Sequence, residues 1–124
     1  MLTIDWDSLR TSSMEDSELA AELIELFLSD TPIQLEGLSG CIETSNAKGV
    51  RQIAHKLKGS CLTIGAVSMA DVCGQLETAA ENRFVADLPR LGSLLSQEFE
   101  TAGTEFRSKA WDGNLFADVN TRDD

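Results

Sequence analysis

The sequence predicts an all-α protein, an antiparallel four-helix bundle with a short N-terminal helical cover. Apolar residues recur with a period near 3.6 along most of the 124 residues, as they do in amphipathic helices. No stretch alternates β-branched and polar residues, and no Asn-Gly or Asp-Gly pair joins two apolar runs, so β-hairpins are not expected. Helices that each carry one apolar stripe, joined by short turns, are typical of an antiparallel bundle.

The cover is expected over residues 5–10, helical or extended, with Trp6 and Leu9 closing one end of the core. The helical pattern fails after Ala110. We therefore expect one domain over residues 1–110 and a flexible tail, without an assigned role, over residues 111–124.

The first long helix is predicted from Ser17, and its apolar face is formed by Leu19, Leu23, Leu26 and Phe27. The next stretch, residues 31–34, has the pattern of a helix start, with Thr31 as the cap and Pro32 at the first helical position. The sequence leaves open whether Pro32 separates two helices or kinks one long helix.

Residues typical of helix ends predict the remaining helices. Asn46 is a suitable cap for a helix that runs to about Ile64, and Gly65 is a natural stop. A further helix is expected to open at Ser68, and the last one follows residues 87–89.

Charge and cysteine content narrow the possible functions. Ten Lys and Arg against 21 Asp and Glu give a formal charge of −11, which disfavours nucleic acid and anionic membranes as partners. There is no signal-peptide pattern and no apolar run of about 20 residues, so a cytoplasmic protein is expected. Cys41, Cys61 and Cys73 are widely spaced, and we expect reduced thiols packed in the core rather than a metal site.

His55 lies on the wrong face of its helix for a core residue. On a helical wheel, Val50, Leu57 and Ile64 fall on the side opposite His55, and they form the buried stripe. The alternative to a functional role is therefore an inert surface histidine.

The neighbours of His55 favour a function. Lys58 lies one turn on, where its ammonium can reach a group attached to the imidazole. Gly59 removes a side chain from the adjoining surface at a cost of about 1 kcal/mol to the helix. Leu62 is apolar where a polar residue is expected, as on a docking surface. An accessible imidazole beside a cation suits a nucleophile that carries an anionic group.

The stretch HKLKGSCLTIGA, residues 55–66, resembles the HxLKGSxxxxGA signature of histidine-containing phosphotransfer (HPt) domains. Ala54 and the pair Leu76-Glu77 also match residues that are common in that family. The order of the predicted helices is similar to that of the family from Leu19 to Phe106.

The resemblance implies a phosphorelay intermediate. His55 would accept a phosphoryl group from a receiver-domain aspartate of a hybrid sensor kinase and pass it to the receiver domain of a response regulator. Lys58 would stabilise the phosphoryl group and Gly59 would give the receiver clearance. The predicted partner-binding residues are Arg51, Gly59, Leu62 and Ala66. The chain would be a phosphocarrier without an ATP site or bound cofactor, and Mg²⁺ would belong to the receiver.

Glu77 is predicted to orient His55. If the turn between the two helices centres near Ala66, each residue lies 11 positions from it, at the same level of an antiparallel pair. A carboxylate there can accept the Nδ1 proton and leave Nε2 as the nucleophile, and the resemblance implies the same arrangement.

Three alternatives stay open. The chain could be an acidic interaction module without phosphoryl chemistry, or a domain of a larger hybrid kinase that works in cis. A monomer is expected, with a dimer that shares helices as the alternative.

Overall fold

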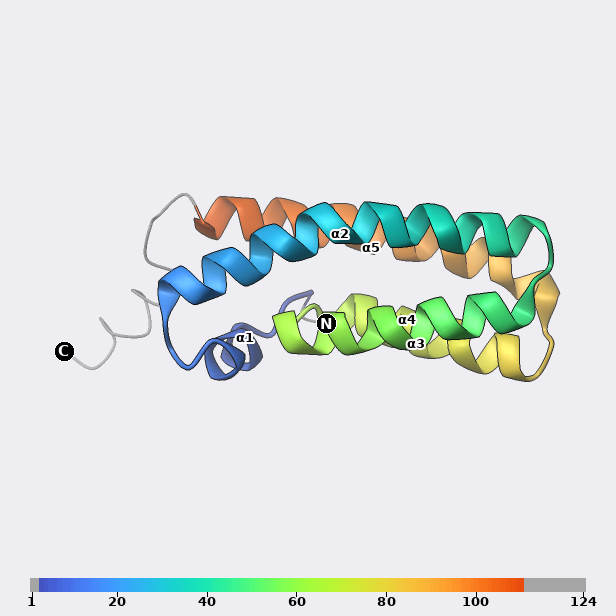
Figure 1. Ribbon diagram of the computed structural model, residues 1–124, viewed down its shortest axis with the longest axis horizontal. Helices are drawn as coiled ribbons and strands as arrows, with labels where there is room; N and C mark the ends of the chain where they lie inside the picture. Colours follow the sequence, from blue (N-terminus) through green and yellow to red (C-terminus); the bar gives the residue numbers. More distant parts are fainter. Residues whose placement is uncertain (1–2, 111–124) are drawn as a thin grey trace.

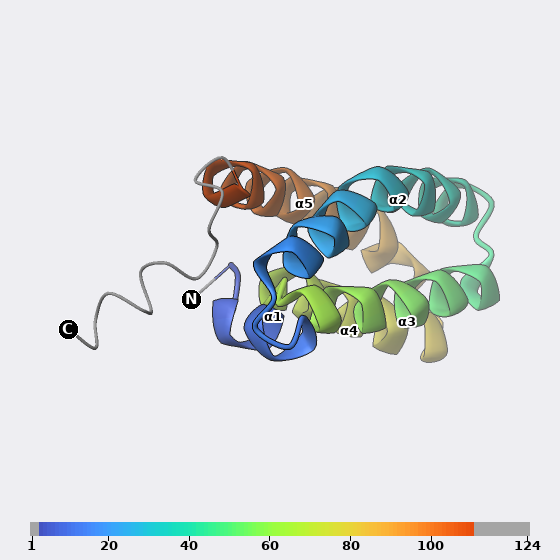
Figure 2. The same ribbon diagram turned by 60° about the vertical axis from the view of Figure 1, so that its left-hand side comes forward.

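The computed structural model describes residues 3–110 as two layers of antiparallel helices (Figures 1 and 2). The elements in chain order are α1 (Trp6–Ser12), α2 (Ser17–Glu43), α3 (Ala47–Ile64), α4 (Val67–Glu81), the 3₁₀ turn η1 (Val85–Asp87) and α5 (Leu88–Ala110). Helices α2 and α5 form one layer, α3 and α4 form the other, and α1 packs against α3 and α2 at one end. No strand occurs within residues 3–110, so the predicted helical bundle with an N-terminal cover is confirmed. The predicted tail, 111–124, lies outside the described residues.

Helix α1 closes the end of the core as expected. The Asp5 side chain caps the helix by accepting a hydrogen bond from the backbone N–H of Asp7 at 3.1 Å. Leu9 is fully buried, and the Trp6 ring meets the Phe106 ring of α5 edge to face, with 5.6 Å between centroids. The first helix and the last are therefore joined through the core.

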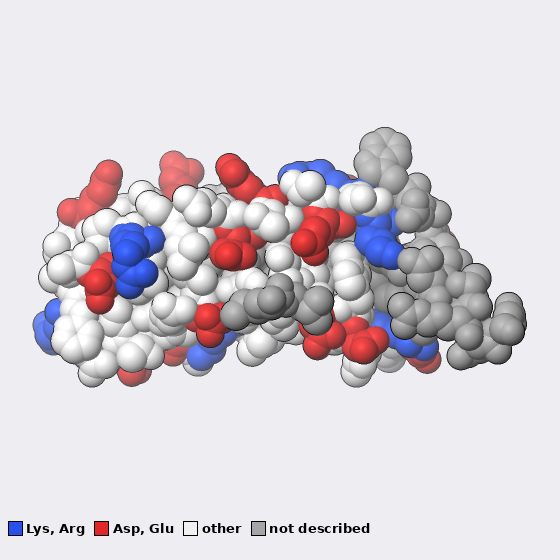
Figure 3. All heavy atoms as spheres, turned by 180° about the vertical axis from the view of Figure 1, so that it is seen from behind, with Lys and Arg blue, Asp and Glu red and all other residues white. Residues whose placement is uncertain are grey.

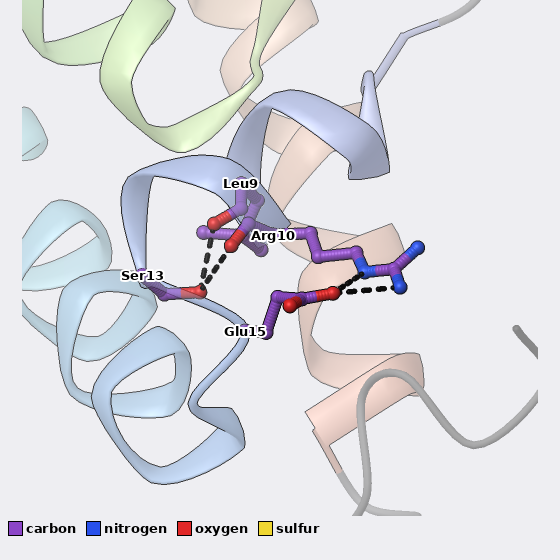
Figure 4. A network of polar contacts seen from close by, with 4 residues as sticks. All are labelled: Leu9, Arg10, Ser13 and Glu15. Carbon is purple, nitrogen blue, oxygen red and sulfur yellow. Dashed lines mark hydrogen bonds and ion pairs between the residues drawn. The ribbon is translucent and has the colours of Figure 1, made fainter. Parts of the chain in front are cut away.

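A network of polar contacts holds the turn between α1 and α2 (Figure 4). Met14 and Glu15 both have positive φ, 54° and 62°, which is uncommon for residues other than glycine. The buried Ser13 hydroxyl donates to the Leu9 carbonyl oxygen at 2.8 Å, and Arg10 Nε donates to Glu15 Oε1 at 2.9 Å. These contacts hold the chain in its reversal before α2 begins.

Helix α2 decides between the two alternatives left open at Pro32 and corrects one prediction. The chain forms one long helix that runs through Pro32 and bends near its middle (Figure 1), so residues 31–34 do not begin a second helix. An internal proline removes one backbone hydrogen bond and destabilises the helix only locally. Phe27 and Thr31, just before it, are buried against the rest of the bundle, and this packing keeps the two halves of α2 in one helix. Leu26 was expected in the core and is instead 58% exposed, because Ile24 occupies the buried face.

The connection between α3 and α4 positions the two helices that carry the candidate site. Asn46 caps α3 by accepting from Gly49 N–H at 3.0 Å, as predicted. Gly65 ends α3 in the left-handed conformation, with φ 86°, and its carbonyl oxygen accepts from the Asp5 N–H at 2.7 Å. The next helix begins at Val67, one residue before the predicted Ser68.

The three cysteines lie in or beside the core, as predicted. Cys61 and Cys73 are buried and Cys41 is half-buried, and all three thiols are free. The hydrogen bond between Cys61 and Cys73 and the burial of Cys61 both raise the pKa of the Cys61 thiol, so it stays protonated. Among residues 3–110, no helix combines the length and apolar character needed to cross a membrane.

Candidate functional site

His55 projects from the outer face of α3. Its side chain is 72% exposed, while the neighbouring Ala54 and Leu57 are fully buried. The rotation of α3 is set by these buried residues, and it places the imidazole in solvent. No hydrogen bond joins Nε2 to any of the described residues, so this nitrogen is accessible.

Glu77 of α4 contacts the other nitrogen of the same ring. Its Oε2 lies 3.1 Å from His55 Nδ1, and its side chain is only 15% exposed. Leu76, fully buried beside it, fixes the rotation of α4 and with it the direction of the carboxylate. Since an ionised carboxylate only accepts hydrogen bonds, we assign the proton of a neutral His55 ring to Nδ1. The lone pair is then on the exposed Nε2.

Lys58 binds the same carboxylate from the other side. Its Nζ lies 2.9 Å from Glu77 Oε1, so one carboxylate holds both the imidazole and the ammonium. The hydrogen bond from Lys58 is the main reason why the pKa of Glu77 is lowered, the bond from His55 adds to the effect, and desolvation opposes it. Glu77 is therefore ionised at neutral pH.

Three of the predicted partner-binding residues are exposed, and one is not. Gly59 faces open space, since a Cβ built there would meet no atom within 4 Å. Leu62 is 53% exposed, and Arg51 is exposed with its guanidinium 3.8 Å from Glu81 of α4. Ala66 is fully buried, because the close packing of the α3–α4 connection encloses it. The prediction that Ala66 contacts a partner is therefore wrong.

An apolar hollow lies beside this surface and was not predicted from the sequence. A pocket of about 210 Å³ lies between α2 and α3, and its lining includes Leu26, Phe27, Ser60 and Thr63. The spacing of Leu26 predicts a core residue, so the sequence does not predict the apolar surface that this side chain forms on α2. An extra leucine beside an already complete apolar stripe was the available signal.

The described residues contain no group of three or more His, Cys, Asp or Glu arranged to hold a metal ion. The polar centre of the site is the trio of His55, Lys58 and Glu77 on two antiparallel helices. In chemical terms, the trio presents an unprotonated nitrogen beside a cation in an open, solvent-accessible place.

The chain is similar to known proteins in sequence and in fold. The family model of the Hpt domain matches residues 22–105. Histidine-containing phosphotransfer protein B (HptB) from Pseudomonas aeruginosa PAO1 is a solved structure with a TM-score of 0.81 and 24% identity, over 86% of this chain and 92% of that one. The HPT domain of a sensor hybrid histidine kinase from Shewanella has a TM-score of 0.73 and 22% identity over the same shares. No curated protein matches the sequence.

Proposed function

Because the chain belongs to the Hpt domain family, we propose that it is a phosphorelay intermediate whose phosphoacceptor is His55. It accepts a phosphoryl group from an aspartate of a hybrid sensor kinase receiver and passes it to the receiver of a response regulator. The observation that carries the proposal is the exposed imidazole with Nδ1 bound to Glu77 and Nε2 open to solvent.

The chemistry follows from the two ring nitrogens. The lone pair of His55 Nε2 attacks the phosphorus of the aspartyl phosphate, a P–N bond forms, the P–O bond to the aspartate breaks, and the aspartate leaves as a carboxylate. The proton stays on Nδ1, where Glu77 offsets the positive charge that develops on the ring. Transfer to the second receiver reverses these steps with another aspartate.

Lys58 supplies the cation for the phosphoryl oxygens. Its ammonium is one helical turn from His55 and is held at the site by Glu77, 2.9 Å away. A flexible side chain of this length can turn from the carboxylate to the phosphoryl group without moving the backbone. In this proposal the chain carries the phosphoryl group and does not take it from ATP, and the Mg²⁺ needed for the chemistry is held by the receiver.

The receiver docks on the surface around Gly59. Clearance at Gly59, the exposed Leu62 and the apolar hollow between α2 and α3 together support this surface as the one that a receiver covers. The exposed Leu26 would add apolar contact on α2.

The Gly59→Gln variant is expected to bind receivers poorly. A long side chain would fill the open space at residue 59, so the receiver concentration that half-saturates transfer should rise at least tenfold. The helix itself should gain up to about 1 kcal/mol, since glycine is a poor helix former. Gly40→Gln on α2, where a Cβ also meets no atom within 4 Å, is the matched control and should transfer like wild type. Normal half-saturation in Gly59→Gln would show that the receiver does not cover this residue.

The Glu77→Ala variant is expected to accept the phosphoryl group at least several-fold more slowly. Without the carboxylate, nothing on α4 holds the proton on Nδ1, so the fraction of rings with a free Nε2 falls. Nitrogen-15 chemical shifts of the imidazole report the two tautomers directly. If the shifts are identical in wild type and Glu77→Ala, Glu77 does not select the tautomer. Glu77→Gln retains an oxygen acceptor and should recover part of the rate.

The test of the proposed function is transfer from receiver domains phosphorylated with acetyl phosphate. Label that moves to this chain and is labile in acid but stable in base would identify a phosphohistidine. Binding of a receiver without any transfer of label would instead favour the interaction module. If only a receiver fused to the same polypeptide transfers label, the chain works as a domain of a hybrid kinase.

A further inference from the structure

The helix that carries His55 differs in charge from the rest of the chain. Helix α3 carries four of the ten basic residues and no acidic residue, although the whole chain has a formal charge of −11. Helix α2, its neighbour, carries six acidic residues and no basic one. On the opposite face, over α4 and α5, acidic side chains are spread widely and basic ones are fewer (Figure 3). Among the helices of the described residues, α3 is thus the only one with a net positive charge.

Two of the basic residues of α3, together with one that follows α4, line a hollow at the start of α3. The hollow has a volume of about 500 Å³ and lies where the turn between α2 and α3 meets the end of α4. We call it the basic cleft and define it by Lys48, Arg51 and Arg83, which line it together with one acidic residue, Glu81. Arg51 is 3.8 Å from Glu81, while Lys48 and Arg83 form no ion pair with any of the described residues.

The basic cleft is close to the phosphoacceptor. Arg51 precedes His55 by four residues and Lys48 by seven, so both fall near His55 on the helical wheel, about 6 Å and 10 Å along the axis. A protein that reacts with His55 can therefore touch the basic cleft with residues that lie close to its own reacting group.

We propose that the basic cleft binds an acidic surface of the receiver next to its phosphorylated aspartate; this inference rests on the proposed function. An aspartyl phosphate is an anion that must approach Nε2 within bonding distance, and a chain of net charge −11 repels an anion at long range. Lys48 and Arg83, which form no ion pair among the described residues, add positive charge on the side of His55 away from Gly59, and this charge guides the acidic edge of the receiver to that side. The cleft thus selects receivers that carry acidic residues at this edge of the docked surface.

Charge reversal in the basic cleft tests the inference. Lys48→Glu and Arg83→Glu should each raise the half-saturating concentration of a phosphorylated receiver at least threefold at about 10 mM salt, where the Debye length is about 30 Å. The maximal transfer rate should not change, since neither residue belongs to the trio of His55, Lys58 and Glu77. At about 1 M salt, where charges are screened beyond about 3 Å, the variants should converge on wild type.

Arg107→Glu is the control. It makes the same change in net charge on an exposed residue of α5. It should shift half-saturation by less than the cleft variants at low salt. If all three variants shift equally, the effect is one of net charge and the basic cleft is not a docking site.

Other outcomes separate this inference from the proposed function. If wild type accepts no phosphoryl group from any receiver, the proposed function fails and the cleft variants are not needed to show it. If wild type transfers normally and the cleft variants do also at low salt, only the inference fails. Light scattering would detect the remaining occupant, a second copy of the chain bound through its acidic α2. Dimerisation that the cleft variants abolish, with transfer unchanged, would overturn the inference.

Discussion

The His55→Gln variant is expected to lose all phosphoryl labelling while keeping the stability of the wild type. The side chain is 72% exposed, so its replacement removes little buried surface and should change the free energy of unfolding by no more than about 0.5 kcal/mol. Glutamine has no nitrogen with a free lone pair, so no P–N bond can form. Labelling by a phosphorylated receiver and the thermal midpoint of the same preparation measure the two effects together.

His55 is the only histidine in the chain, which makes this test sharp. Label that survives in His55→Gln must be bonded to another kind of residue, and its stability to acid and base would identify which. Lys56→Gln is a suitable control, because Lys56 is the adjacent exposed residue of α3 and forms no ion pair among the described residues. Equal loss of label in the control would mean that His55 has no special role.

The exposure of His55 was predictable because the apolar residues of α3 determine its rotation. Val50, Leu57 and Ile64 are all buried, and a residue on the opposite side of the wheel must then face solvent. The ends of α3 were predictable for a similar reason, since the cap at Asn46 and the left-handed residue Gly65 satisfy backbone groups locally. Features that a single helix determines by itself could thus be predicted.

Features that depend on contacts between helices could not be predicted in the same way. The sequence around Pro32 favours a helix start, and only packing against the bundle shows why α2 continues. Ala66 directly follows Gly65 in a turn at the end of the signature, where an exposed residue is expected, yet the neighbouring segments bury it completely. The sharing of Glu77 between His55 and Lys58 depends on side-chain torsions across two helices, whereas the sequence predicted only that Glu77 and His55 lie at one level.

Gly65 links the N-terminal segment to the two helices of the candidate site. Its φ of 86° is in the left-handed region, and a Cβ at this position would overlap the carbonyl oxygen of Asp5. The same two residues are joined by the hydrogen bond from Asp5 N–H to the Gly65 carbonyl oxygen. Any side chain at residue 65 must therefore strain the turn and push away the segment that leads into α1.

Gly65→Ala is consequently expected to lower the free energy of unfolding by at least about 2 kcal/mol, which corresponds to a thermal midpoint roughly 8 °C lower. Gly74→Ala is the matched control, because a Cβ at that helical position meets no atom within 4 Å, and it should stabilise α4 by up to about 1 kcal/mol. Calorimetry of the two variants separates the effect of strain from that of an added methyl group. Displacement of the Asp5 segment should also expose Leu9 and Trp6, which close the end of the core, so amide exchange in α1 should accelerate more than in α5. A Gly65→Ala protein as stable as wild type would mean that the cover does not depend on this close contact between Asp5 and the turn.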